Sequence, residues 1–155
     1  MCKGVNPAYG VVYTGKRWII GTKDNGIWYS AAKDPTSTYI QIQYNSPQWP
    51  NAIMSNGSSV TIVGGSGNNS NRLYKFNETT TSFSFYTSTT PFVTSPSHIR
   101  QIGYVKSSAT WFVPMAGTVN GNNSLRISSN NGTSWTDISS VHTNLRVCEG
   151  GAAVI

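Results

Sequence analysis

Apolar and polar residues alternate in short runs along the whole chain, and turn residues separate the runs. Arg17-Trp18-Ile19-Ile20 and Ser82-Phe83-Ser84-Phe85 are examples of this alternation, which is typical of a half-buried β-strand. Asn-Gly dipeptides separate several of the runs, and they supply the positive φ that type I′ hairpin turns require. The pattern therefore predicts short antiparallel strands joined by hairpins.

The predicted strands group into a repeat of about 46 to 52 residues, a period that is looked for first in repeat proteins. Three segments align, and each has three hairpin-linked strands followed by a fourth aromatic strand. The strands are expected at 8–13, 17–22, 27–30 and 39–43, then at 51–55, 60–64, 72–76 and 83–87, and finally at 98–104, 111–116, 124–128 and 135–138. A partial unit starts at 145–148 and the sequence stops within it. We place the units at about residues 5–46, 47–90, 97–140 and 141–155.

Four-stranded units of roughly 40 to 50 residues are the blades of β-propellers. We therefore expect an all-β fold over residues 1–155: a β-propeller-like array of four-stranded antiparallel blades, with about three and a half units. Closed rings use roughly four to eight blades, so the ring is expected to be incomplete in this chain. A two-sheet sandwich is the alternative, but it does not predict four strands that recur with aligned turns.

Composition supports strands and turns, and it narrows the classes of partner. Ser, Thr, Asn and Gly make up 68 of the 155 residues and Leu only three, which argues against a helical bundle. The net charge of +6 comes from 11 Lys and Arg against 5 acids. Because these bases are scattered, we expect no specific nucleic-acid binding.

No apolar run approaches the roughly 18 residues that would insert into a membrane. No signal peptide is visible, and the compartment stays unassigned.

One eight-residue segment carries a specific motif. Residues 128–135 have the sequence Ser-Ser-Asn-Asn-Gly-Thr-Ser-Trp, which resembles the Asp-box S-x-D-x-G-x-[ST]-W with Asn130 in place of Asp. Residues 76–83 of the second unit keep the length of the box, whereas residues 30–39 of the first carry an insertion and no Gly. The chain thus resembles the Asp-box (BNR-repeat) β-propeller family, which includes sialidases and non-catalytic plant, bacterial and viral propellers. The resemblance implies a structural turn on the outer rim, formed by Ser128, Asn130, Gly132, Ser134 and Trp135.

The catalytic set of the sialidases is not recognisable in this chain. Those members use three Arg, a Tyr–Glu pair and an Asp, with an Arg-Ile-Pro-like motif that is missing here. Arg17 and Arg126 lie next to buried-type positions and are as easily interpreted as outward-facing partners of the strand alternation, while Asp24 and Glu78 are interpreted as turn acids. Two His and two Cys match no zinc spacing. We therefore expect a protein that is not an enzyme, with no catalytic residue, no metal and no cofactor.

Two non-catalytic functions remain. The first is a structural or interaction module, part of a longer polypeptide or completed by copies of itself or another protein. The composition of the chain, rich in Asn, Ser and Thr and poor in acids, resembles that of propellers from large viruses and phages. This resemblance suggests a virion or a cell surface. The alternative is a carbohydrate-binding propeller lectin, in which Trp49, Tyr44 and Tyr86 supply aromatic platforms for a glycan or a partner. Trp49 is favoured because flanking prolines keep it out of a central strand. A second alternative is a fragment of a sialidase-like glycoside hydrolase.

The chain has two cysteines, which lie near its opposite ends. Cys2 and Cys148 are either two free thiols or a disulfide bridge between the two ends.

Overall fold

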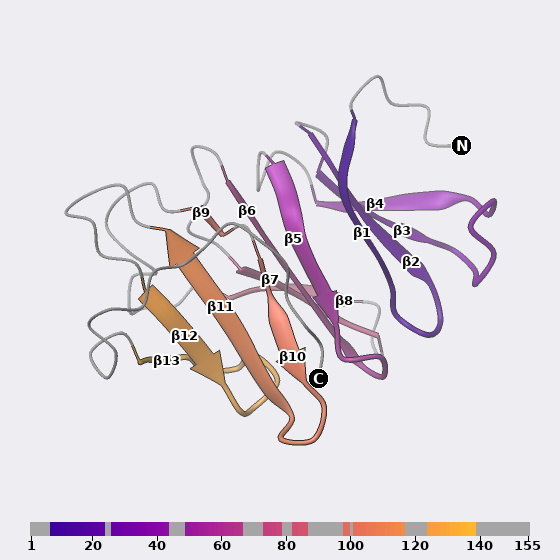
Figure 1. The fold of residues 1–155 in the computed structure, drawn as a ribbon. Coiled ribbons are helices and arrows are strands. Elements are labelled where there is room, and N and C mark those ends of the chain that lie inside the picture. Colours follow the sequence, from indigo (N-terminus) through magenta and orange to yellow (C-terminus); the bar gives the residue numbers. More distant parts are fainter. Residues whose placement is uncertain are drawn as a thin grey trace.

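The computed structural model describes residues 7–23, 26–43, 49–66, 73–78, 82–86, 98–99, 101–116 and 124–138 (Figure 1). Within these ranges every regular element is a β-strand, which confirms the predicted all-β class. The strands are β1 (Ala8–Tyr13), β2 (Trp18–Thr22), β3 (Gly26–Ser30), β4 (Tyr39–Gln43), β5 (Trp49–Ser55), β6 (Val60–Ser66), β7 (Leu73–Asn77), β8 (Ser82–Tyr86), β9 (His98–Ile99), β10 (Gly103–Val105), β11 (Thr110–Ala116), β12 (Ser124–Ser128) and β13 (Thr136–Asp137).

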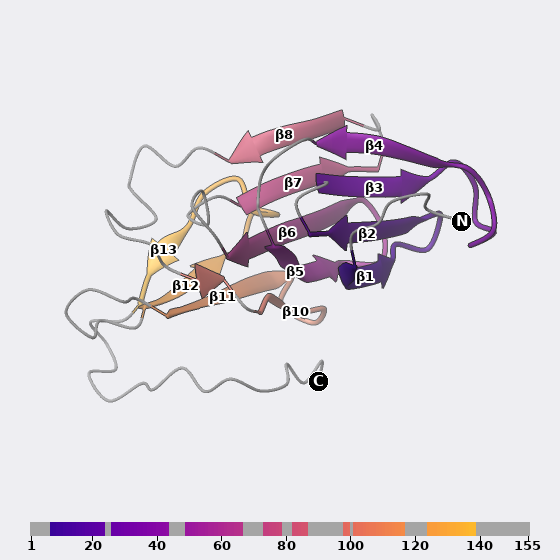
Figure 2. The same cartoon turned by 90° about the horizontal axis from the view of Figure 1, so that it is seen from above.

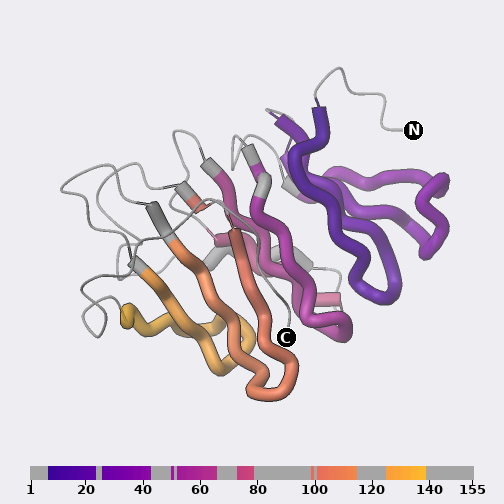
Figure 3. Tube along the Cα trace, in the orientation of Figure 1, coloured from indigo at the N-terminus to yellow at the C-terminus, as the bar shows by residue number. Residues whose placement is uncertain are grey.

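Consecutive strands form three antiparallel sheets. The first sheet has the order β1-β2-β3-β4, the second β5-β6-β7-β8 and the third β10-β11-β12-β13, while β9 pairs with the end of β11. The trace in Figure 3 runs up and down through each sheet before it passes to the next. Figure 2 shows β1, β5 and β10 along one side of the array and β4 and β8 along the other. Repeated antiparallel sheets are confirmed, with four strands in the first and second sheets and five in the third. The described sheets do not close on themselves, so the propeller ring stays a prediction.

The first strand of the third unit differs from the prediction. The sequence predicts one strand over 98–104, whereas the structure has β9 and β10, which both pair with β11. The other two sheets have an irregularity at the corresponding place. The register of β1 with β2 shifts between Ala8 and Gly10, and that of β5 with β6 shifts between Trp49 and Ala52. Such bulges interrupt pairing without leaving a mark in the alternation of apolar and polar residues.

The second sheet begins earlier than expected. The sequence predicts its first strand from residue 51, but β5 starts at Trp49, which pairs with Ser66. Pro50 has no N–H to donate to a ladder. It is tolerated because β5 lies at the edge of its sheet, where one side of the strand has no partner strand in that sheet.

The turn at Asn56-Gly57 is not of type I′. Gly57 has a φ of +77°, but Asn56 does not share the positive φ that type I′ needs at both central residues. Asn56 instead holds a longer loop together. Its Oδ1 accepts hydrogen bonds from the backbone N–H groups of Ser58, Ser59 and Val60, each at 3.0 Å, and its own N–H donates to the Val60 carbonyl at 2.9 Å.

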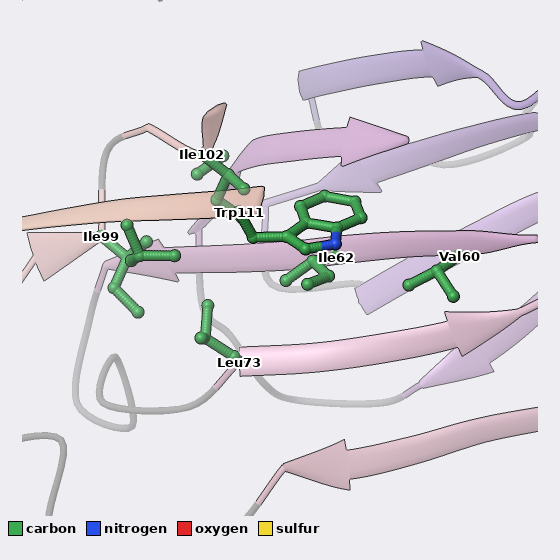
Figure 4. Close-up of a cluster of buried hydrophobic side chains, with 8 residues drawn as sticks. Val60, Ile62, Leu73, Ile99, Ile102 and Trp111 are labelled. Atoms are coloured by element: carbon green, nitrogen blue, oxygen red, sulfur yellow. The ribbon is translucent and has the colours of Figure 1, made fainter. Parts of the chain in front are cut away.

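The second sheet lies between the other two and buries both of its faces. Successive side chains of a strand point to opposite faces. On β6, Ile62 therefore joins a cluster shared with the third sheet, and Val63 joins one shared with the first. The cluster between the first and second sheets is Ile19, Ile27, Val63, Tyr74 and Phe76. The cluster between the second and third is Ala52, Val60, Ile62, Leu73, Ile99, Ile102, Trp111 and Val113, and Figure 4 shows the indole of Trp111 beside Ile62.

Two glycines allow the sheets to approach each other closely. A Cβ on Gly21 of β2 would meet the backbone carbonyl oxygen of Pro50 in the second sheet and would lie 2.7 Å from Cγ of the same residue. A Cβ on Gly64 of β6 would lie 2.5 Å from Cγ2 of Ile99 in the third sheet. Both distances are shorter than a van der Waals contact. The same kind of joint, a glycine beneath the first strand of the following sheet, therefore occurs at both sheet–sheet contacts.

Candidate functional site

The face of the first sheet that points away from the second sheet is apolar and partly exposed. Val12 and Ile19 point toward the second sheet, so their chain neighbours point to the opposite face. Val11 on that face is 59% exposed, and the other apolar side chains are partly exposed. We call this surface the open face of the first sheet; it consists of Val11, Tyr13, Trp18 and Ile20.

The open face carries an aromatic pair that recurs in the third sheet. Tyr13 and Trp18 are cross-strand neighbours, with ring centroids 5.0 Å apart and ring planes at 44°. Tyr104 and Trp111 pair in the same way, at 4.6 Å and 46°. Trp111 is fully buried in the contact with the second sheet, whereas Trp18 is partly exposed. The open face thus has the aromatic pair that the third sheet packs against its neighbour.

The third sheet also has an apolar face that points away from the second. Trp111 and Val113 belong to the cluster with the second sheet, so the alternate residues of β11 lie on the other face. Their cross-strand partners on β12 share that face, and all of them are partly exposed. We call this surface the open face of the third sheet; it consists of Phe112, Pro114, Leu125 and Ile127. The described array therefore ends in an apolar face on both sides.

The motif residues 128–135 form a turn that is held by its own polar groups. Ser128 Oγ accepts a hydrogen bond from the Gly132 N–H at 2.9 Å. Asn130 Oδ1 accepts one from the Ser134 N–H at 2.9 Å, and Asn130 Nδ2 donates to Ser134 Oγ at 2.7 Å. Gly132 has a φ of +73°, which favours glycine. The polar groups of the motif therefore bond to each other and to the backbone of the turn.

The same turn contacts the second sheet. A Cβ on Gly132 would lie 2.8 Å from Cδ1 of Ile62, so the backbone of the turn closely approaches the second sheet. Thr133 Oγ1 accepts a hydrogen bond from Lys75 Nζ at 3.3 Å. Trp135 packs against the cluster between the second and third sheets. The turn therefore contributes to the joint between these sheets.

The interpretation of Arg17 as an outward-facing residue is wrong. Arg17 Nε donates to Glu78 Oε2 at 3.1 Å, and this ion pair connects the first sheet with the second. The Arg17 guanidinium also lies 5.2 Å from the ring centroid of Tyr29. Glu78 follows β7 as a turn acid would, but its side chain is fully buried and its Oε1 has no hydrogen-bond partner. Sequence reasoning missed the pair because nothing local relates two residues that are 61 positions apart.

Arg126 does not face outward either. Its cross-strand partner is Val113, which faces the second sheet, so Arg126 shares that face. Arg126 is only 8% exposed, and its Nη2 lies 3.2 Å from Asp137 Oδ2. The alternation of apolar and polar residues therefore does not predict the face of Arg126, whose ion-pair partner Asp137 is exposed.

The aromatic residues predicted to bind a ligand are not brought together by the described residues. Trp49 opens β5 and Tyr86 ends β8, so β6 and β7 separate them, and the side chains of both lie outside the described part. Tyr44 lies outside the described residues altogether, as do Asp24, Cys2 and Cys148. A glycan site at Trp49, Tyr44 and Tyr86 therefore stays a prediction.

The remaining acid of the described part is Asp34, which is exposed in a loop. Its Oδ1 accepts hydrogen bonds at 2.8 Å from both the N–H and the hydroxyl of Thr36. These two bonds, the backbone one foremost, hold the pKa of Asp34 below its ordinary value of 3.8. Among the described residues no three His, Cys, Asp or Glu side chains group as metal ligands would. In the same residues no helix is long and apolar enough to cross a bilayer.

No protein-family model matches the chain, and comparisons with curated proteins and with solved structures found no match.

Proposed function

We propose that the chain is a non-enzymatic structural or interaction module of β-propeller type that works within a larger assembly. The observation that carries this proposal is the pair of apolar open faces at the two ends of the described array. Exposed, contiguous apolar surface is a hazard for a protein that stays alone, and it is typical of interaction sites. A module of this kind functions through the surfaces that its partners cover.

The form of the sheets supports a propeller. Three meanders of four strands follow each other, and the first strands β1, β5 and β10 lie along the same side (Figure 2). Blades of a propeller have this order, with the first strand of every blade toward one side of the array. The resemblance of residues 128–135 to the Asp-box points to the same family of folds. In this chain the turn packs between two sheets, a structural task that leaves binding to other surfaces.

The contacts at the two described joints suggest which kind of molecule covers the open faces. Each joint buries a continuous apolar cluster between neighbouring sheets. The open face of the first sheet has the same strand positions and the same Tyr–Trp pair as the face by which the third sheet packs. The expected occupant is therefore protein with a flat apolar surface, which a soluble small molecule does not provide.

A single charged substitution tests the proposal. Val11→Lys places a charge on the open face, and because Val11 is exposed, the fold of the chain should persist. The matched control is Ser107→Lys, which adds the same charge at an exposed turn residue that belongs to neither open face. We expect the unaltered chain and the control to form species larger than one chain of 16.8 kDa, as measured by light scattering after size exclusion. Val11→Lys should elute as a single chain with an unchanged circular dichroism spectrum. An unaltered chain that stays at the mass of one chain up to high concentration would contradict the proposal.

A further inference from the structure

We propose that the partner is a second copy of this chain, and that the open face of its third sheet covers the open face of the first sheet, head to tail. This inference rests on the proposed function, because it names the occupant of the same surface. It requires that the two faces complement each other in the way that the described joints do.

Equivalent positions in the first and third sheets follow from the strand registers. Trp18 pairs with Tyr13, and Trp111 pairs with Tyr104, so the two Trp have the same position. Three residues beyond each Trp lie Gly21 in the first sheet and Pro114 in the third. Pro114 therefore has the place in the third sheet that Gly21 has in the first.

The strand registers also identify the residue of the following sheet that packs onto the position of Gly21 and Pro114. Ile99, which packs onto Gly64, pairs with Met115, the residue after Pro114. Ala8 pairs with Thr22, the residue after Gly21. Ala8 therefore has the position in the first sheet that Ile99 has in the third. In a head-to-tail pair, Ala8 of one copy would meet Pro114 of the other.

The sizes of the two side chains, Ala8 and Pro114, complement each other at this predicted contact. At the two described joints the later sheet meets a glycine: the backbone carbonyl and the ring of Pro50 lie on Gly21, and the side chain of Ile99 lies on Gly64. At the predicted joint the sizes are exchanged, because the later sheet offers the small Ala8 and the earlier sheet offers Pro114. Each joint thus combines one bulky residue with one small residue, which keeps the space between the sheets filled.

The number of sheets fits a closed arrangement. The described part of each copy contributes three sheets, so the described parts of two copies supply six, within the range of roughly four to eight blades that closed propellers use; the predicted partial unit at 141–155 lies outside the described residues. A contact between two different faces either closes into a ring or continues as a filament. Two copies joined at both ends form a ring in which no apolar open face remains exposed.

Crosslinking between two variants tests the geometry. At the described joints, an added Cβ would lie 2.8 Å from the Cβ of Pro50 and 3.1 Å from that of Ile99, so an equivalent pair of Cys lies within reach of a disulfide. Ala8→Cys and Pro114→Cys are made in separate chains in which Cys2 and Cys148 are replaced by Ser. Both sites are at least partly exposed, and circular dichroism checks that each variant folds. The two variants are incubated alone and mixed, with oxidised glutathione as the electron acceptor.

The inference predicts a disulfide-linked species of two chains in the mixture and none in either variant alone. Linkage of Ala8→Cys to itself would overturn it, because that result shows a two-fold symmetric contact. A mixture that keeps the mass of an assembly without crosslinking would overturn the head-to-tail joint and leave the proposed function intact. Single chains throughout would overturn both. Crosslinks in species that grow far beyond two chains would support the joint and overturn the two-copy ring.

Discussion

Replacing Gly64 by Ala should drive the second and third sheets apart. The added Cβ would lie 2.5 Å from Cγ2 of Ile99, 3.1 Å from its Cβ and 3.2 Å from Cδ2 of Leu73. Ile99 and Leu73 are both buried in the cluster between the sheets, so neither side chain can withdraw into solvent. The strain is therefore borne by the packing of one sheet on the other.

The magnitude follows from two opposing effects. Overpacking a filled core costs about 1–3 kcal/mol, and the smaller entropy of the unfolded chain returns about 0.4–1 kcal/mol when Gly becomes Ala. We expect a net loss of about 1–2 kcal/mol in the free energy of unfolding. In a chain of this length the Tm should fall by about 2–8 °C. The matched control is Gly103→Ala, whose Cβ would have its nearest neighbour at 3.8 Å, an ordinary contact. The control should keep or slightly raise the stability.

The assay is urea unfolding followed by tryptophan fluorescence at a fixed protein concentration. A double-mutant cycle identifies the cause of the loss, because Ile99→Ala removes the methyl group that the new Cβ meets. In that background Gly64→Ala should cost at least about 1 kcal/mol less than in the unaltered chain. The reasoning fails if Gly64→Ala is as stable as Gly103→Ala, or if its cost is the same with and without Ile99.

Three further changes probe other contacts. Asn130→Ala should cost about 1–2 kcal/mol in thermal unfolding because it removes the acceptor for a backbone N–H of the turn, whereas Asn130→Asp keeps that acceptor and should stay within about 0.5 kcal/mol; equal losses would contradict this role. Arg17→Met should cost about 3 kcal/mol at pH 7 because it leaves the buried carboxylate of Glu78 without its cation, and a change below about 0.5 kcal/mol would show that the pair does not contribute. Thr36→Ala should raise the pKa of Asp34 part of the way toward 3.8 in a carboxyl NMR titration, since the backbone hydrogen bond remains. Because the folded-state pKa of Asp34 is lowered, its contribution to stability is present above pH 3.8 and is lost as the pH falls through the folded-state pKa; an unchanged pKa in the variant would refute the role of the hydroxyl.

The local pattern predicts the strands well because each short strand carries its own signal. The predicted ranges of β1, β4 and β12 agree with the structure at both ends, and the described ends of the other strands of the first two units lie within two residues of the predicted ones. The alternation does not mark irregular pairing. The bulge near Trp49 and the interruption between β9 and β10 depend on how two strands pair, so no single strand reveals them.

Contacts between units are the part that the sequence does not reveal. The Arg17–Glu78 pair joins two sheets, and neither residue has a local feature that predicts its partner. The close approach of Ile99 to Gly64 likewise depends on how one sheet lies on the next. The motif at 128–135 is local, and for that reason its position after the third strand of its unit could be read from the sequence. The open faces become recognisable only when the stacking shows which side of each strand is covered.

The central claim is that this chain is an assembling module whose end sheets are covered by protein. Sedimentation equilibrium of the unaltered chain over a wide range of concentrations tests it most directly. We predict a mass of two chains, twice 16.8 kDa, that dissociates on dilution. A single species at the mass of one chain at every concentration, unfolding in one cooperative transition, would contradict it.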